Sequence, residues 1–136
     1  MGIKVLIADD NAMMLGFLEK LVKKAPNVDT ILGVKNGKEA VDQAQTFSPD
    51  MILMDVEMPE MDGLTALKQI KSLQKTGKVN PKAKVIILSG TMHENDTNVR
   101  KAKFLGASYV FPKPGGGDRS FSIDAAALMK ALQDVG

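Results

Sequence analysis

The sequence predicts an α/β fold in which a parallel five-stranded sheet carries helices on both faces. Short apolar runs alternate with stretches whose apolar residues recur at helical spacing, and this alternation repeats five times along the chain. No linker long enough to divide domains interrupts it. Apolar residues make up 44% of the 136 residues and charged residues 25%, which is typical of a soluble domain. We therefore expect one doubly wound domain spanning residues 1–136.

The first two strand–helix units occupy the first third of the chain. Ile3–Ala8 is a short run rich in β-branched residues and predicts a strand. Asn11 can cap the helix that follows, from about Ala12 to Lys24. Asp29–Val34 predicts the second strand, and apolar residues at helical spacing predict a helix over Lys38–Thr46.

The remaining three units follow the same order. Met51–Met54 is continuously apolar, as expected for a strand that is buried on both faces. A helix is expected from about Leu64 to Lys75, after a loop that contains proline and glycine. Val85–Leu88 is the most strand-like run of the chain, and a helix over about Asn95–Leu105 follows it. The last unit pairs a strand at Tyr109–Phe111 with a helix at about Ile123–Val135.

Composition excludes several classes of function. The chain has no cysteine, which excludes disulfides, thiol catalysis and cysteine-ligated metals, and its one histidine, His93, excludes a multi-histidine metal site. The net charge of +2 is too balanced to indicate nucleic-acid or membrane binding. The lysine-rich stretch 71–84 is either a solvated face or a docking site for an acidic partner. Without a signal peptide or an apolar run long enough to span a bilayer, we expect a cytoplasmic protein with no membrane insertion.

Polar residues follow four of the predicted strands. Asp9 and Asp10 come after the first strand, Asp55 after the third, Ser89 after the fourth and Lys113 near the end of the fifth. In parallel α/β sheets, ligands bind beyond the carboxyl ends of the strands, so these groups are expected to converge there. Two carboxylates about 4 Å apart repel by roughly 4 kcal/mol at an effective dielectric constant near 20, so such a cluster needs cations. Oxygen-only ligands favour Mg²⁺.

This set of groups suits phosphoryl transfer to a carboxylate. Asp55 would be the nucleophile, Mg²⁺ and Lys113 would neutralise charge on the phosphoryl oxygens, and the Ser89 hydroxyl would donate a hydrogen bond to one of them. Taken singly, an aspartate after a strand is as readily explained as a helix cap or a turn former. The joint pattern at four strand ends is what favours a site.

Four motifs together resemble the receiver domain of two-component response regulators. They are the Asp9-Asp10 pair, the D-x-x-M-P-x-M-D-G run from Asp55 to Gly63, Ser89-Gly90 and Lys113-Pro114. The resemblance covers essentially the whole chain and implies a flavodoxin-like three-layer sandwich with strand order 2-1-3-4-5. The VEMPEMDGL run and the GGGDRS stretch before the last helix resemble the receiver of chemotaxis methylesterases more than a typical single-domain regulator.

The resemblance also implies roles for the acidic residues. Asp55 would be the phosphoacceptor and a ligand of Mg²⁺. Asp10 would bind the ion directly and Asp9 through water. Glu57 falls where the family's third protein ligand is a backbone carbonyl, so its side chain need not take part.

The switch residues follow the family pattern only in part. Ser89 takes the place of the family's switch Ser/Thr, and Lys113 that of its invariant lysine, whose bond to the next proline is cis in the family. Three residues before this lysine, where receivers usually carry an aromatic switch residue, stands Val110. Strand alternation points its neighbours Tyr109 and Phe111 to the opposite face. Either the aromatic gate is absent, or a local bulge re-aims Tyr109.

The resemblance implies a phosphorylation-dependent signalling switch rather than a metabolic enzyme. A histidine kinase would supply the phosphoryl group, and a downstream protein would recognise the face made by the fourth helix, fifth strand and fifth helix. The opening Met1 and the short chain favour a stand-alone receiver, and the alternative is a piece of a larger regulator such as a chemotaxis methylesterase. An aspartyl-phosphate phosphatase or a flavin protein is a further alternative. The former needs a second aspartate two residues after the nucleophile, where Glu57 stands.

Overall fold

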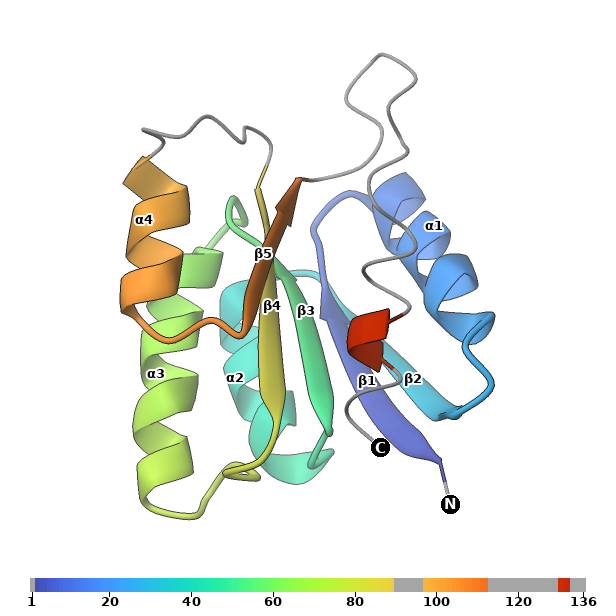
Figure 1. The fold of residues 1–136 in the computed structure, drawn as a ribbon. Helices are drawn as coiled ribbons and strands as arrows, with labels where there is room; N and C mark the ends of the chain where they lie inside the picture. The colour runs from blue at the N-terminus through green and yellow to red at the C-terminus, as the bar shows by residue number, and fades with distance from the viewer. Residues whose placement is uncertain (1, 90–96, 113–129, 133–136) are drawn as a thin grey trace.

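Five parallel strands form the central sheet of the computed structural model, which describes residues 2–89, 97–112 and 130–132 (Figure 1). The strand order is β2-β1-β3-β4-β5, which confirms the predicted doubly wound arrangement. The strands are β1 (Ile3–Ala8), β2 (Val28–Val34), β3 (Met51–Asp55), β4 (Lys84–Ser89) and β5 (Tyr109–Pro112).

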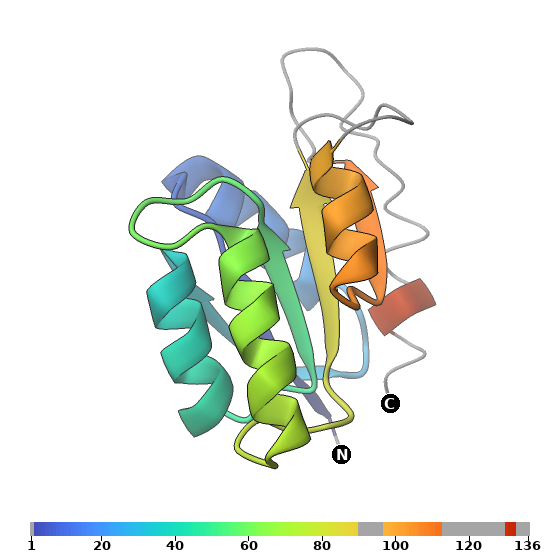
Figure 2. The same cartoon turned by 90° about the vertical axis from the view of Figure 1, so that its left-hand side faces the viewer.

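Helices cover both faces of this sheet and make a three-layer sandwich. They are α1 (Ala12–Lys23), α2 (Gly37–Thr46), α3 (Gly63–Lys75) and α4 (Thr97–Phe104). Helices α2, α3 and α4 lie on one face, whereas α1 and the helical residues 130–132 lie on the other (Figures 1 and 2). Most of the predicted last helix and the predicted start of α4 lie outside the described residues.

Strand alternation divides the core into two apolar layers. Leu6, Ile52 and Ile87 pack under α2, α3 and α4, whereas their neighbours Ile7 and Leu53 pack under α1. Every residue of β3 is buried, as its continuously apolar sequence predicts for a central parallel strand. The sheet is therefore anchored from both sides, and its carboxyl edge is held at a fixed position.

Side-chain caps begin three of the helices at that carboxyl edge. Asn11, Asn36 and Asp62 each accept a hydrogen bond from the backbone N–H three residues further on, at 2.8 to 3.0 Å. Such caps satisfy amides that have no partner within the helix. They explain why α2 and α3 begin one residue earlier than the apolar spacing predicts: each starts at the glycine that directly follows its cap.

In the part of the chain that the structure describes, no helix has the length and apolar character needed to cross a membrane.

Candidate functional site

Three aspartates converge at the carboxyl edge of the sheet. Asp9 and Asp10 follow β1, and Asp55 is the last residue of β3, the strand that pairs directly with β1. One carboxylate oxygen from each of the three lies within 4.8 Å of the others. Asp9 and Asp55 are buried, at 0% and 3% exposure, whereas Asp10 is exposed. The three carboxylates therefore converge as the strand ends predict, with two of them buried and the third exposed at the surface.

Backbone amides hold the two buried carboxylates in place. The Asn11 N–H donates to Asp9 Oδ1 at 2.9 Å, and the Glu57 N–H approaches Asp55 Oδ1 at 3.4 Å. The Asp9 N–H itself donates to the Val34 carbonyl at 3.0 Å, which extends the β1–β2 ladder to the site. Amide donors stabilise an ionised carboxylate and fix its orientation. The Glu57 side chain is exposed.

The loop between β3 and α3 brings its backbone unusually close to Asp55. The Gly63 N–H donates to the Val56 carbonyl at 2.8 Å, and a Cβ at position 63 would collide with the Asp55 carbonyl oxygen. The Gly37 N–H at the start of α2 donates to the Met61 carbonyl at 3.0 Å. Gly63 closes the motif that begins at Asp55, but no structural role was predicted for it from the sequence; the structure makes it a positioning residue.

Ser89 ends β4 at the same edge of the sheet. Its side chain is buried, with 2% exposure, and β4 pairs with β3 so that Leu88 lies opposite Asp55. By alternation, Ser89 lies on the face of the sheet that Ile87 shares with α3 and α4. Lys113 and its bond to Pro114 lie outside the described residues, as does His93.

The aromatic residues of β5 lie on the other face. The register between β4 and β5 runs without a shift from Tyr109 to Pro112, so no bulge turns Tyr109 around. Tyr109 and Phe111 stack on each other, with ring centroids 5.7 Å apart, and pack against the α1-side core. Val110 packs against the opposite core layer, the one that includes residues of α3 and α4. The strand alternation expected from the sequence therefore holds at this position.

The donor set fits a hard divalent cation. All three side chains offer carboxylate oxygens, and three negative charges this close together are stabilised by a small ion of high charge. Asp10 lies at the rim, so an ion at the cluster would keep access to water and to a substrate oxygen.

Comparison with known proteins decides the family. The family model for the response regulator receiver domain matches residues 5–122, which is most of the chain. The chain belongs to this family. In this receiver domain, Asp9, Asp10 and Asp55 all lie within the matched region.

Relatives of this receiver domain include chemotaxis proteins. A protein-glutamate methylesterase/protein-glutamine glutaminase from Carboxydothermus hydrogenoformans is 38% identical over 84% of the chain and 30% of its own length. The crystal structure of the response regulator domain of Thermotoga maritima CheB superposes with a TM-score of 0.82 at 30% identity, covering 99% of this chain and 96% of that one. A chain of the CheX–CheY–BeF₃–Mg²⁺ complex from Borrelia burgdorferi superposes with a TM-score of 0.74 at 26% identity, covering 98% and 88%. The receiver domain thus spans about a third of the length of the curated methylesterase relatives that it matches.

Proposed function

We propose that this receiver domain is a phosphorylation-dependent switch in which Asp55 accepts a phosphoryl group from the phosphohistidine of a partner kinase. The convergence of three carboxylate oxygens within 4.8 Å at the end of β3 is the observation that carries the proposal. Asp55 is the one member of the cluster that lies within a strand, and that strand is buried along its whole length. A nucleophile fixed in this way loses little entropy when it reacts.

Mg²⁺ is the proposed cofactor. Asp9, Asp10 and Asp55 would hold it with their carboxylates, and the backbone carbonyl of Glu57 is the proposed further ligand. When bound, the ion neutralises negative charge on the phosphoryl oxygens. The oxygen-only donor set supports this choice over softer metals.

The transfer itself needs only positioning and charge compensation. An Asp55 carboxylate oxygen attacks phosphorus, an O–P bond forms, and the P–N bond to the donor imidazole breaks. A proton from solvent on the other ring nitrogen allows the imidazole to leave as a neutral base. Ser89, buried at the end of the adjacent strand, is proposed to donate its hydroxyl hydrogen to a phosphoryl oxygen, and Lys113 to supply the second positive charge.

The proposal is tested with acetyl phosphate as a small donor. Wild-type protein in the presence of Mg²⁺ should gain the mass of one phosphoryl group, and Asp55→Asn should gain none. Asp42→Asn, which removes an exposed carboxylate on α2, is the matched control and should react like the wild type. Phosphorylation of Asp55→Asn at the wild-type level would reject the assignment.

The output of the switch is proposed to be a change in partner binding in the cytoplasm. A downstream protein would bind the face made by α4, β5 and the following helix, where Ser89 and Val110 lie on the α4 side of the sheet. Tyr109, which packs on the opposite face, is proposed to stabilise the α1-side core rather than to act as the aromatic gate. The Tyr109→Phe variant should then keep the wild-type response to phosphorylation, measured as the affinity for the kinase.

A methylesterase-type regulator is the second candidate context, because relatives matched over most of this chain carry that name. In that case the switch would control a hydrolase, whereas the receiver domain itself is proposed to carry no hydrolase activity. An antibody against the receiver domain decides between the two, since it would detect either a protein of this size or one about three times longer in the source cells. Release of methanol from a methyl-glutamate substrate by the purified 136-residue chain would contradict the non-enzymatic assignment.

A further inference from the structure

The groove between α3 and α4 carries a concentration of positive charge that the phosphorylation site does not use. One hollow of about 440 Å³ lies between the two helices and is lined from α3 by Leu64 and Lys68 and from α4 by Lys101 and Phe104. A second hollow, of about 460 Å³, continues along α4 past Arg100 and shares Lys101 and Phe104 with the first. Lys101 and Phe104 therefore lie where the two hollows adjoin, and the first hollow is the groove between α3 and α4.

Phe104 is the most exposed large apolar side chain in the described part of the molecule. Its exposure is 89%, although it ends a helix whose Val99 and Ala102 are buried in the core. An isolated exposed apolar residue needs no explanation, but one that separates two hollows offers an anchor for an apolar side chain.

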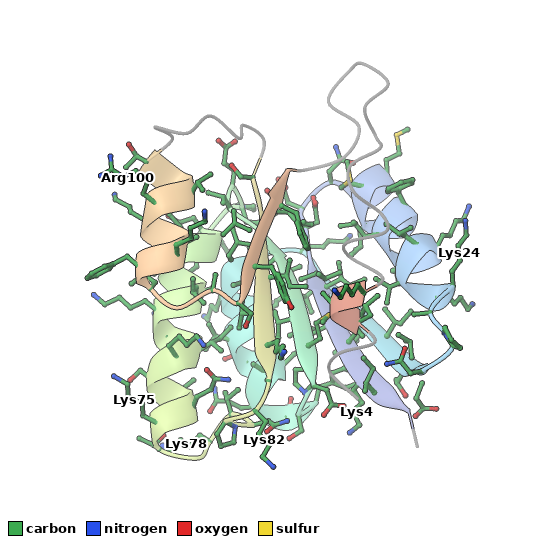
Figure 3. All side chains as sticks on the ribbon, viewed as in Figure 1. Lys4, Lys24, Lys75, Lys78, Lys82 and Arg100 are labelled. Atoms are coloured by element: carbon green, nitrogen blue, oxygen red, sulfur yellow. The ribbon has the colours of Figure 1, made fainter. Side chains whose placement is uncertain are left out.

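Positive side chains line the hollows on either side of Phe104. On α3, Lys68, Lys71 and Lys75 recur at helical spacing and form a stripe, in which Lys68 lines the groove and Lys71 lies against Gly106, just past the end of α4. On α4, Lys101 lines the groove, and Arg100 lines the second hollow that adjoins it. Figure 3 places Arg100 on α4 and Lys75 on α3 at the same side of the molecule. Among the described lining residues, Asp62 is the one acidic side chain, and its carboxylate caps α3.

The opposite flank of α3 shows that this charge is local. There a hollow of about 380 Å³ lies between α2 and α3, and its described lining residues include Asp42, Gln45 and Gln69 but no lysine or arginine. Two hollows of similar size therefore flank the same helix, and of their described lining residues the basic ones lie on the side toward α4.

We infer that the α3–α4 groove binds a short acidic segment of a partner protein, with an apolar side chain of that segment against Phe104 and its carboxylates between the lysines and Arg100. Charge complementarity selects this occupant. The net charge of +2 and the small extent of the patch do not suit a nucleic-acid backbone, and one aromatic residue on an eight-residue helix does not anchor a protein to a bilayer. The interaction does not need Asp55, so its test does not depend on the phosphorylation proposal.

The test uses a short fluorescein-labelled peptide that repeats glutamate, glutamate and leucine, with binding to the full chain followed by fluorescence anisotropy. Lys101→Glu should raise the Kd about tenfold or more, and Phe104→Ala about fivefold. Lys78→Glu makes the same charge change at an exposed residue just beyond α3 and should alter the Kd by less than about twofold. Asp55→Asn should bind as tightly as the wild type. Lys78, Lys101 and Phe104 are exposed, so the variants at these three positions should keep the wild-type melting temperature.

Three results would overturn the inference. The first is equal weakening by Lys101→Glu and Lys78→Glu, which would reduce the binding to general charge attraction. The second is equal affinity for a peptide in which serine replaces leucine, because Phe104 would then contribute nothing. The third is tighter binding, sensitive to Lys101→Glu, to single-stranded RNA or to phosphatidylserine vesicles than to the acidic peptide. Resonances of α3 and α4 that shift on titration with the peptide, while those of α1 do not, would support it.

Discussion

Among the single residues, the three clustered aspartates differ in their environments. Asp9 and Asp55 are buried and oriented by backbone amides of the residues that follow them. Asp10 is exposed at the rim, where its removal creates no cavity. We propose that it contributes a third negative charge, which would disfavour the metal-free state, and a ligand for a bound dication.

The Asp10→Asn variant separates the effect of charge repulsion on stability from the effect of a lost ligand on Mg²⁺ affinity. Without divalent ions, the variant should melt at a slightly higher temperature than the wild type because one repulsive charge is gone. Its affinity for Mg²⁺ should fall by about tenfold or more because a ligand is lost. Calorimetric titration with MgCl₂ and thermal melts in EDTA measure both, with Asp42→Asn as the control. Unchanged Mg²⁺ affinity in Asp10→Asn would remove this residue from the proposed site.

Among the elements of the fold, the β3–α3 loop holds Asp55, the proposed acceptor, in position. Asp55 ends a fully buried strand, and Gly63, at the start of α3, passes so close to the Asp55 carbonyl that no side chain fits. The Asp62 carboxylate fixes the start of α3 at this point by accepting the Thr65 N–H at 2.8 Å. The loop therefore cannot shift far without moving the end of β3, where Asp55 lies.

A pair of glycine variants tests this restriction. Gly63→Ala should destabilise the fold by about 2 kcal/mol or more, because the new methyl group collides with backbone rather than with a movable side chain. Gly16→Ala, in the middle of α1, meets no atom within 4 Å and should stabilise the fold by about 0.5–1 kcal/mol through better helix propensity. Urea unfolding measures both. A neutral Gly63→Ala would contradict the close approach.

The elements themselves could be predicted well from the sequence because periodicity and caps are local signals. The strand Ile3–Ala8 is observed with the predicted bounds, and Asn11 caps α1 as expected. The Gly63 contact could not be predicted, because it depends on how a loop folds back on a strand, which no spacing in the sequence records. The same holds for the α3–α4 groove, since its lysines and Phe104 come from two helices that only the tertiary fold brings together.

At the scale of the whole molecule, two separate apolar layers hold the sheet, and each depends on different helices. The α1-side layer includes Ala131 and Leu132, so a segment from the end of the chain completes the core beneath β1 and β3. The Asn27 side chain, just before β2, donates to the Leu132 carbonyl at 2.8 Å and links this segment to the first third of the chain. Stability and the rigidity of the strand ends are therefore shared across the chain.

The Leu132→Ala variant tests how far the stability of the fold depends on the packing of residues 130–132. The side chain is fully buried, so its truncation should lower the free energy of unfolding by about 2–5 kcal/mol. The neighbouring Lys130→Ala, at an exposed position, should change it by less than about 0.5 kcal/mol. A small effect of Leu132→Ala in chemical denaturation would mean that residues 130–132 do not pack against the α1-side core.

In the proposed function, the three aspartates form one phosphoacceptor site with Asp55 as the nucleophile. Borohydride reduction tests it most directly, because it converts an aspartyl phosphate into homoserine, which peptide mass spectrometry locates. After reaction with acetyl phosphate and Mg²⁺, homoserine should appear at position 55 and at no other aspartate, and EDTA should abolish it. Homoserine at a different position, or an equal yield at position 55 in the presence of EDTA, would contradict the claim.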